Sequence, residues 1–93
     1  MIVGIMVLDL YSGNTHNLKE KRRLVLSLKE RLRRRFNVAA IESAYQDSWQ
    51  RAQISMVTLS MSRQVLDQLL SRIENFVAET YPMFVVTVER EFF

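Results

Sequence analysis

Apolar and polar positions along the chain predict six regular segments in the order strand, helix, strand, strand, helix, strand. Residues 2–10 are nearly all apolar and rich in β-branched side chains, which is typical of a central strand covered on both faces. Further strands are expected at residues 38–45, 54–61 and 84–89, the last with apolar and polar side chains in alternation.

The first helix is expected over residues 18–36. Its apolar side chains fall on one face at spacings of 7, 3, 4 and 4 residues, namely Leu18, Val25, Leu28, Leu32 and Phe36. Asn17 and Glu20 match a capping box, in which Asn17 is the N-cap and Glu20 reaches back from the first turn.

The second helix is expected over residues 62–81, where Ser60 or Ser62 can cap its first turn. The connections carry turn chemistry. Residues 12–14 read Ser-Gly-Asn, and residues 46–50, polar apart from one tryptophan, are expected to join two strands as a hairpin.

The order β-α-β-β-α-β defines the split βαβ, or ferredoxin-like, arrangement of the α+β class. Right-handed crossovers place both helices on one face of a four-stranded antiparallel sheet, with the first and third strands central. We therefore expect residues 1–93 to form a single ferredoxin-like domain.

This arrangement leaves the second face of the sheet uncovered, although the first strand is apolar on both sides. Val3, Ile5 and Val7 lie on one side of that strand, and contiguous exposed apolar surface usually marks an interface. We expect a homodimer or higher oligomer through the open face or an edge strand. A monomer in sedimentation at micromolar concentration would contradict this expectation.

Positive charge is concentrated in the first predicted helix. Nine of the 13 Lys and Arg residues lie within residues 19–35, opposed only by Glu20 and Glu30, so this segment carries about +7. The second predicted helix carries about −1. Clustered cations raise the potential at one surface and favour a polyanionic partner.

The favoured hypothesis is a non-catalytic protein that binds RNA or the ribosome, because the planar donors of arginine suit phosphate. The residues selected for this contact are Lys19, Arg22, Arg23, Lys29, Arg33 and Arg34. An acidic protein partner and a simply solvated face stay open as alternatives. Base stacking on the sheet is disfavoured because the central strands carry one aromatic side chain, Tyr11.

A second hypothesis is a protein-interaction or assembly module. It would act through the apolar sheet face and through the hairpin that carries Trp49 and Arg51. For Trp49, stacking on a base, anchoring a partner protein, and packing against the domain or a dimer all stay open. Salt separates the two hypotheses, since it weakens electrostatic RNA binding and barely changes apolar association.

Three motifs carry a resemblance to a known family: His-Asn-Leu-Lys-Glu-Lys-Arg-Arg at 16–23, Arg-Phe-Asn-Val at 35–38 and Asp-Ser-Trp-Gln-Arg-Ala at 47–52. With Val-Glu-Arg-Glu at 88–91, they resemble the YlxP-like family of small bacterial proteins of unknown function. The resemblance covers essentially the whole chain and implies a ferredoxin-like fold, but no activity. Genes of this family often neighbour those of translation and ribosome-maturation factors, which favours an RNA or ribosome partner.

The composition of the chain makes metal-binding and catalytic functions less favoured than binding functions. The chain has no cysteine, which excludes disulfides and thiolate metal sites and favours a cytoplasmic location. The single histidine, His16, precedes the first helix, where it could help to bind a phosphate or serve as a loop residue. Because no phosphate loop, nucleophile motif or paired carboxylates are recognised, we expect no enzyme activity, cofactor, metal, small-molecule substrate or membrane association.

Overall fold

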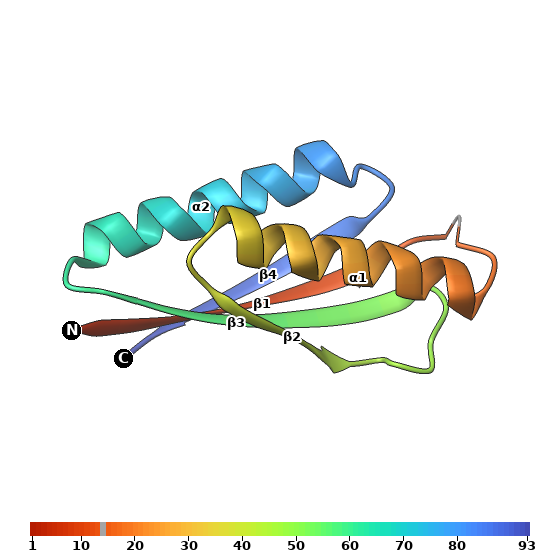
Figure 1. Ribbon diagram of the computed structural model, residues 1–93, viewed down its shortest axis with the longest axis horizontal. Helices are drawn as coiled ribbons and strands as arrows, with labels where there is room; N and C mark the ends of the chain where they lie inside the picture. Colours follow the sequence, from red (N-terminus) through yellow and green to blue (C-terminus); the bar gives the residue numbers. More distant parts are fainter. Residues whose placement is uncertain (14) are drawn as a thin grey trace.

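The computed structural model describes residues 1–13 and 15–93 and contains the six expected elements in the expected order. They are β1 (Ile2–Tyr11), α1 (Leu18–Arg35), β2 (Ala39–Ala44), β3 (Arg51–Ser60), α2 (Arg63–Thr80) and β4 (Val85–Phe92), as Figure 1 shows. Asn14, part of the predicted turn at 12–14, lies outside the described residues.

The four strands form one antiparallel sheet in the order β2-β3-β1-β4, so β1 and β3 are central, as predicted. β3 begins at Arg51, three residues before the predicted start, because it pairs with β1 along the whole length of that strand. Tyr11 lies opposite Arg51, and Ile2 lies opposite Ser60. β4 likewise continues past the predicted Glu89 to Phe92, which lies opposite Gly4.

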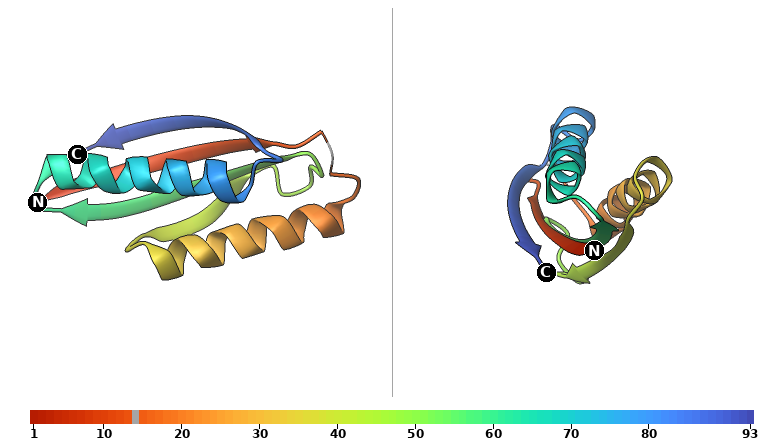
Figure 2. Two further views of the ribbon diagram at one scale, coloured as in Figure 1. Left: turned by 90° about the horizontal axis from the view of Figure 1, so that it is seen from above. Right: turned by 90° about the vertical axis from the view of Figure 1, so that its left-hand side faces the viewer.

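Both helices cover the same face of the sheet, and the two views of Figure 2 show the other face without a covering element in the described chain. Alternate side chains of β1 and β3 point into the space between the layers, where they meet the apolar stripes of the helices. The fully buried set includes Met6, Leu8, Ile54, Leu28, Leu32, Leu70, Ile73 and Val77.

Helix caps follow the sequence prediction in their main features. The side-chain Oδ1 of Asn17 accepts a hydrogen bond from the backbone N–H of Glu20 at 2.8 Å. The reciprocal bond from the side chain of Glu20 is not among the hydrogen bonds of residues 1–13 and 15–93. Ser62 caps α2, since its Oγ accepts from the backbone N–H of Val65 at 3.3 Å, while Ser60 accepts from the backbone N–H of Ser62.

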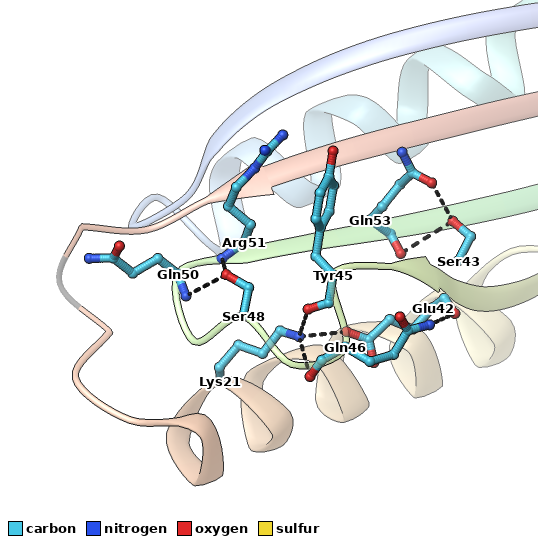
Figure 3. A network of polar contacts seen from close by, with 9 residues as sticks. All are labelled: Lys21, Glu42, Ser43, Tyr45, Gln46, Ser48, Gln50, Arg51 and Gln53. Carbon is cyan, nitrogen blue, oxygen red and sulfur yellow. Dashed lines mark hydrogen bonds and ion pairs between the residues drawn. The ribbon is translucent and has the colours of Figure 1, made fainter.

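Lys21, one of the nine cations counted in the first helix, does not lie on the exposed surface of α1. Its side chain is buried beneath the β2–β3 hairpin, and only 1% of the residue is exposed. Figure 3 shows its Nζ donating to the carboxylate of Glu42 at 2.7 Å and to the backbone carbonyl of Tyr45 at 2.9 Å. Lys21 therefore joins α1 to the hairpin and adds nothing to the exposed cationic surface.

The backbone turns sharply where this lysine binds. Tyr45 has a positive φ of 65°, a backbone conformation that residues other than glycine adopt rarely. The carbonyl of this residue accepts a hydrogen bond from Lys21. The guanidinium of Arg51 lies 4.0 Å from the centre of the Tyr45 ring on the opposite side of the hairpin base. The start of the hairpin is thus held by a buried cation and by an exposed cation–π contact.

Candidate nucleic-acid interface

The six residues selected from the sequence do not form one uniform surface. Lys19, Arg22, Arg23 and Arg34 are exposed on α1. Lys29 is half-buried. The exposed residues are available to a large anionic partner, and Arg34 is the only one of them with an ion pair in the described chain, a contact of 3.3 Å to Glu30.

Arg33 has a structural contact that its selection did not anticipate. Its guanidinium donates a hydrogen bond to the backbone carbonyl of Ala40 in β2. β2 is an edge strand, and a charged side chain on an edge carbonyl obstructs pairing with a further strand. Arg33 therefore protects a sheet edge, and its removal would confuse a test of nucleic-acid binding.

Arginines from both helices gather around the ring of Phe76. Arg31, Arg34 and Arg35 of α1 line a hollow of about 330 Å³ against Phe76 of α2. A neighbouring hollow of about 180 Å³ is lined by Arg35, Arg72 and Phe76, among other residues. We call this surface the arginine groove, defined by Arg31, Arg34, Arg35, Arg72 and Phe76.

Three of these arginines lie over aromatic rings. The guanidinium carbon of Arg35 is 5.0 Å from the centre of the Phe76 ring. Arg31 lies 5.7 Å from the ring centre of Tyr81, and Arg72 lies 5.7 Å from that of Phe36. A guanidinium is attracted to the negative face of an aromatic ring, so these contacts help to order side chains that are otherwise long and mobile.

The rings are themselves fixed by the fold. Phe36 and Tyr81 are buried, and each is the C-cap of its helix. Phe36 and Phe76 pack edge to face with their centres 5.7 Å apart, and the hydroxyl of Tyr81 hydrogen-bonds that of Ser27 at 3.0 Å. The arginine groove therefore rests on a rigid aromatic base that spans both helices.

The sequence interpretation selected only one of the four arginines in this groove. Arg31 and Arg35 were not among the residues selected on the first helix, and Arg72 belongs to the second helix, whose net charge is only about −1. Arg72 and Phe76 are four residues apart, so both lie on one helical face, which was an available signal. Which element that face meets is decided by tertiary packing.

The open face of the sheet has a different character. Apolar side chains from three strands adjoin on it, and we call them the open-face patch: Val3, Ile5 and Val7 of β1, Ile41 of β2, and Val57 and Leu59 of β3. A hollow of about 280 Å³ on this patch is lined by Ile5, Ile41 and Val57, among other residues. Tyr11 is the one aromatic side chain in β1 and β3, at the end of its strand.

The β2–β3 hairpin presents the residues selected for protein contact. Half of the surface of Trp49 is exposed, and Arg51 is exposed above the ring of Tyr45. His16 is exposed before the first turn of α1. Within the described residues, no cluster of His, Cys, Asp and Glu is suited to hold a metal ion, and no helix is long and apolar enough to cross a membrane.

The fold is that of a ferredoxin-like sandwich, here with a cationic helix layer and an apolar open face. The chain belongs to the family described as "Protein of unknown function (DUF503)", which matches residues 3–90. It is 34% identical, over 89 residues and 96% of each chain, to the uncharacterized protein YlxP of Bacillus subtilis strain 168. The resemblance found in the three sequence motifs is thereby confirmed.

Solved structures share the fold at low sequence identity. A de novo designed protein, Foldit4, is similar with a TM-score of 0.59 and 14% identity, over 98% of this chain and 97% of its own. A dimeric ferredoxin-like protein from an uncultured marine organism is similar with a TM-score of 0.54 and 15% sequence identity, over 98% of this chain and 92% of its own. SnoaB, a cofactor-independent oxygenase from Streptomyces nogalater, is similar with a TM-score of 0.51 and 10% sequence identity, over 97% of this chain and 90% of its own. These likenesses support the fold alone.

Proposed function

We propose that this protein is a non-catalytic RNA-binding protein, acting on free RNA or on the ribosome, that contacts the phosphate backbone through the helix layer. The observation that carries the proposal is a contrast between cations on different surfaces. Arg63 pairs with Asp67 at 3.6 Å, and Arg90 pairs with Glu74 at 3.3 Å. On the outer surface of α1, by comparison, the single carboxylate partner among the described residues is Glu30.

An excess of exposed cations without partners is costly unless an anionic partner or solvent ions neutralise it. A nucleic-acid backbone does so with a gain in free energy, because its condensed counterions are released. The contact is driven by charge and shape, since the open face of the sheet lacks the aromatic pair on which an RNA-recognition motif stacks bases. We therefore expect weak discrimination among base sequences.

Binding to a short single-stranded RNA should weaken about 60-fold between 50 and 200 mM salt, as a slope of roughly −3 for four or five phosphate contacts requires. The variant Arg23→Gln/Arg34→Gln should reduce the magnitude of this slope by about 1.4. Fluorescence anisotropy with a labelled oligonucleotide measures both.

The matched control is Arg51→Gln/Arg63→Gln, which removes the same charge from the opposite sheet face and from α2. Its slope should equal that of the unmodified protein. No RNA binding at 50 mM salt, or equal slopes for both variants, would contradict contact through α1. Arg33 is left unchanged in this test because it protects the edge of β2.

We also propose a second function, self-association through the open-face patch, because Val57 and Leu59 of this apolar surface are 40% and 59% exposed. Sedimentation at about 20 μM should give twice the monomer mass, within the range in which apolar interfaces form dimers. Val57→Lys/Leu59→Lys should give the monomer mass.

The matched control for the dimer is Leu26→Lys, which adds a charge at an exposed leucine of α1 outside the patch. This variant should stay dimeric, and raising the salt concentration should leave the mass unchanged. A monomeric unmodified protein would exclude this second function without affecting the RNA proposal. Trp49 then stays available for an assembly partner.

A further inference from the structure

We propose that the arginine groove is the subsite that holds the phosphodiester backbone of a single RNA strand. This inference rests on the proposed function and deepens it, because it selects four arginines of two helices in place of the whole outer surface of α1. It also transfers the main contact from Arg22 and Lys29 to Arg31, Arg35 and Arg72.

The first argument is the way in which these arginines are held. A cation–π contact is an attraction between the guanidinium charge and the ring and occupies no hydrogen-bond acceptor, whereas an ion pair occupies the N–H groups at the edge of the guanidinium. Arg31, Arg35 and Arg72 each lie over a ring and have no ion pair among the described residues. Their edge donors are therefore free for the bidentate hydrogen bonds that arginine forms with phosphate oxygens.

The second argument is preorganisation. Ordering a free arginine on binding costs side-chain entropy. The rings of Phe36, Phe76 and Tyr81 already restrict the groove arginines, because the first and last of these rings are buried and Phe76 packs against Phe36. Lys19 and Arg22, by contrast, are exposed in the first turns of α1, where they contact no aromatic ring or carboxylate of residues 1–13 and 15–93. Phosphate contact in the groove thus has the lower entropic cost.

The third argument is the local charge. Two carboxylates lie near the groove, Glu30 at 3.3 Å from Arg34 and Glu79 on the wall of the smaller hollow. Four arginines against these two leave a net positive site, although the arginines come from helices of very different total charge. Arg35 and Arg72 are more than 35 residues apart in the sequence. The packing of α1 against α2 therefore brings together cations that are distant along the chain.

The shape of the groove favours a single strand over a duplex. A duplex presents its phosphates across a wide, shallow minor groove and needs cations spread over a broad surface. Here Arg31, Arg34 and Arg35 surround a hollow of about 330 Å³ between the two helices, and Arg72 lines the neighbouring hollow of about 180 Å³. An unpaired strand can bend its backbone into such a hollow, and its bases can stack on exposed guanidinium planes.

The test uses the full chain and three probes: a labelled 12-nucleotide oligouridine, a 12-base-pair RNA duplex and inorganic polyphosphate of matched length. The groove variant is Arg31→Gln/Arg35→Gln/Arg72→Gln. The end variant, Lys19→Gln/Arg22→Gln/Arg23→Gln, removes the same charge from the other end of α1. At 50 mM salt the groove variant should bind oligouridine more than about 30-fold more weakly, and the end variant no more than about tenfold, which corresponds to the single phosphate contact of Arg23.

Folding and charge are controlled by Arg31→Lys/Arg35→Lys/Arg72→Lys, which keeps the charge and loses the bidentate donors. It should bind oligouridine about fivefold more weakly while its circular dichroism and urea midpoint show a folded protein. Binding equal to that of the unmodified protein would overturn the assignment to this groove, because charge alone would then account for the contact.

The outcomes separate this inference from the proposed function. If the unmodified protein binds neither RNA probe at 50 mM salt, the proposed function fails and the groove assignment fails with it. If it binds oligouridine and the groove and end variants lose affinity equally, only the groove assignment is overturned. Tighter binding of the duplex or of polyphosphate than of oligouridine would overturn the assignment to a single RNA strand.

Discussion

Replacing Lys21 by methionine is expected to lower the free energy of unfolding by about 3 kcal/mol, at the lower end of the cost of breaking a buried ion pair. The substitution keeps the apolar stem and removes the ammonium group that contacts Glu42 at 2.7 Å and the carbonyl of Tyr45 at 2.9 Å. The carboxylate is then left without its donor, and the carbonyl keeps only its hydrogen bond from the backbone N–H of Ser48 at 3.0 Å. Urea unfolding followed by circular dichroism measures the loss.

The control for this prediction is Lys19→Met, two residues away on the exposed surface of α1. It should change the free energy of unfolding by less than about 0.5 kcal/mol. The double variant Lys21→Met/Glu42→Gln should recover part of the loss, because the carboxylate side chain, 18% exposed, would no longer carry an unpaired charge. A loss below about 1 kcal/mol in Lys21→Met would contradict a stabilising role for the pair.

Lys21 also shows what the helix pattern could and could not reveal. It lies seven residues before Leu28, so the same periodicity that defined the core face placed this lysine on it. A charge count treats all nine cations of the segment alike and hides that position. The partners were not predictable, because Glu42 and the carbonyl of Tyr45 reach Lys21 only once the hairpin folds over α1.

The fold itself was predictable because each local signal agreed with the global pattern. Asn17 and Ser62 cap their helices, and alternation in β1 separates Met6 and Leu8, which face the helices, from Ile5 on the open face. The polar start of β3 was missed because its strand conformation is imposed by pairing with β1 and not by its own residues.

The candidate site was predictable in its overall charge and in the outward positions of some of its arginines. The positions of Arg22, Arg23 and Arg34 on the outer surface follow from the periodicity of α1. The contact of Arg33 with Ala40 and the meeting of Arg35 with Arg72 around Phe76 depend on how α1 packs against β2 and α2. Such contacts join distant segments, so spacing within one element cannot show them.

Gly4→Val is expected to lower the free energy of unfolding by about 3 kcal/mol, at the upper end of the usual cost of overpacking a core. Gly4 is buried in the central strand β1, where a Cβ atom would lie 2.8 Å from Cδ2 and 3.0 Å from Cγ of Leu66. Leu66 is completely buried in α2, so its side chain has little room to move away. Urea unfolding measures this loss, and Gly13→Ala is the glycine control, because a Cβ there would have its nearest neighbour at an ordinary 3.7 Å.

A double-mutant cycle with Leu66→Ala tests whether this contact causes the loss. Leu66→Ala alone should cost about 3 kcal/mol, because it leaves a cavity between α2 and β1. In Gly4→Val/Leu66→Ala, the added valine fills that cavity, so the total loss should be about 3 kcal/mol and not the sum of the two single losses. A double variant as unstable as the sum would instead place the cost of Gly4→Val in the backbone of β1, away from α2. Arg72 and Phe76 of the arginine groove lie on α2, the helix that carries Leu66. If the contact with Leu66 causes the loss of stability in Gly4→Val, then α2 must approach β1 closely for the arginine groove to assemble.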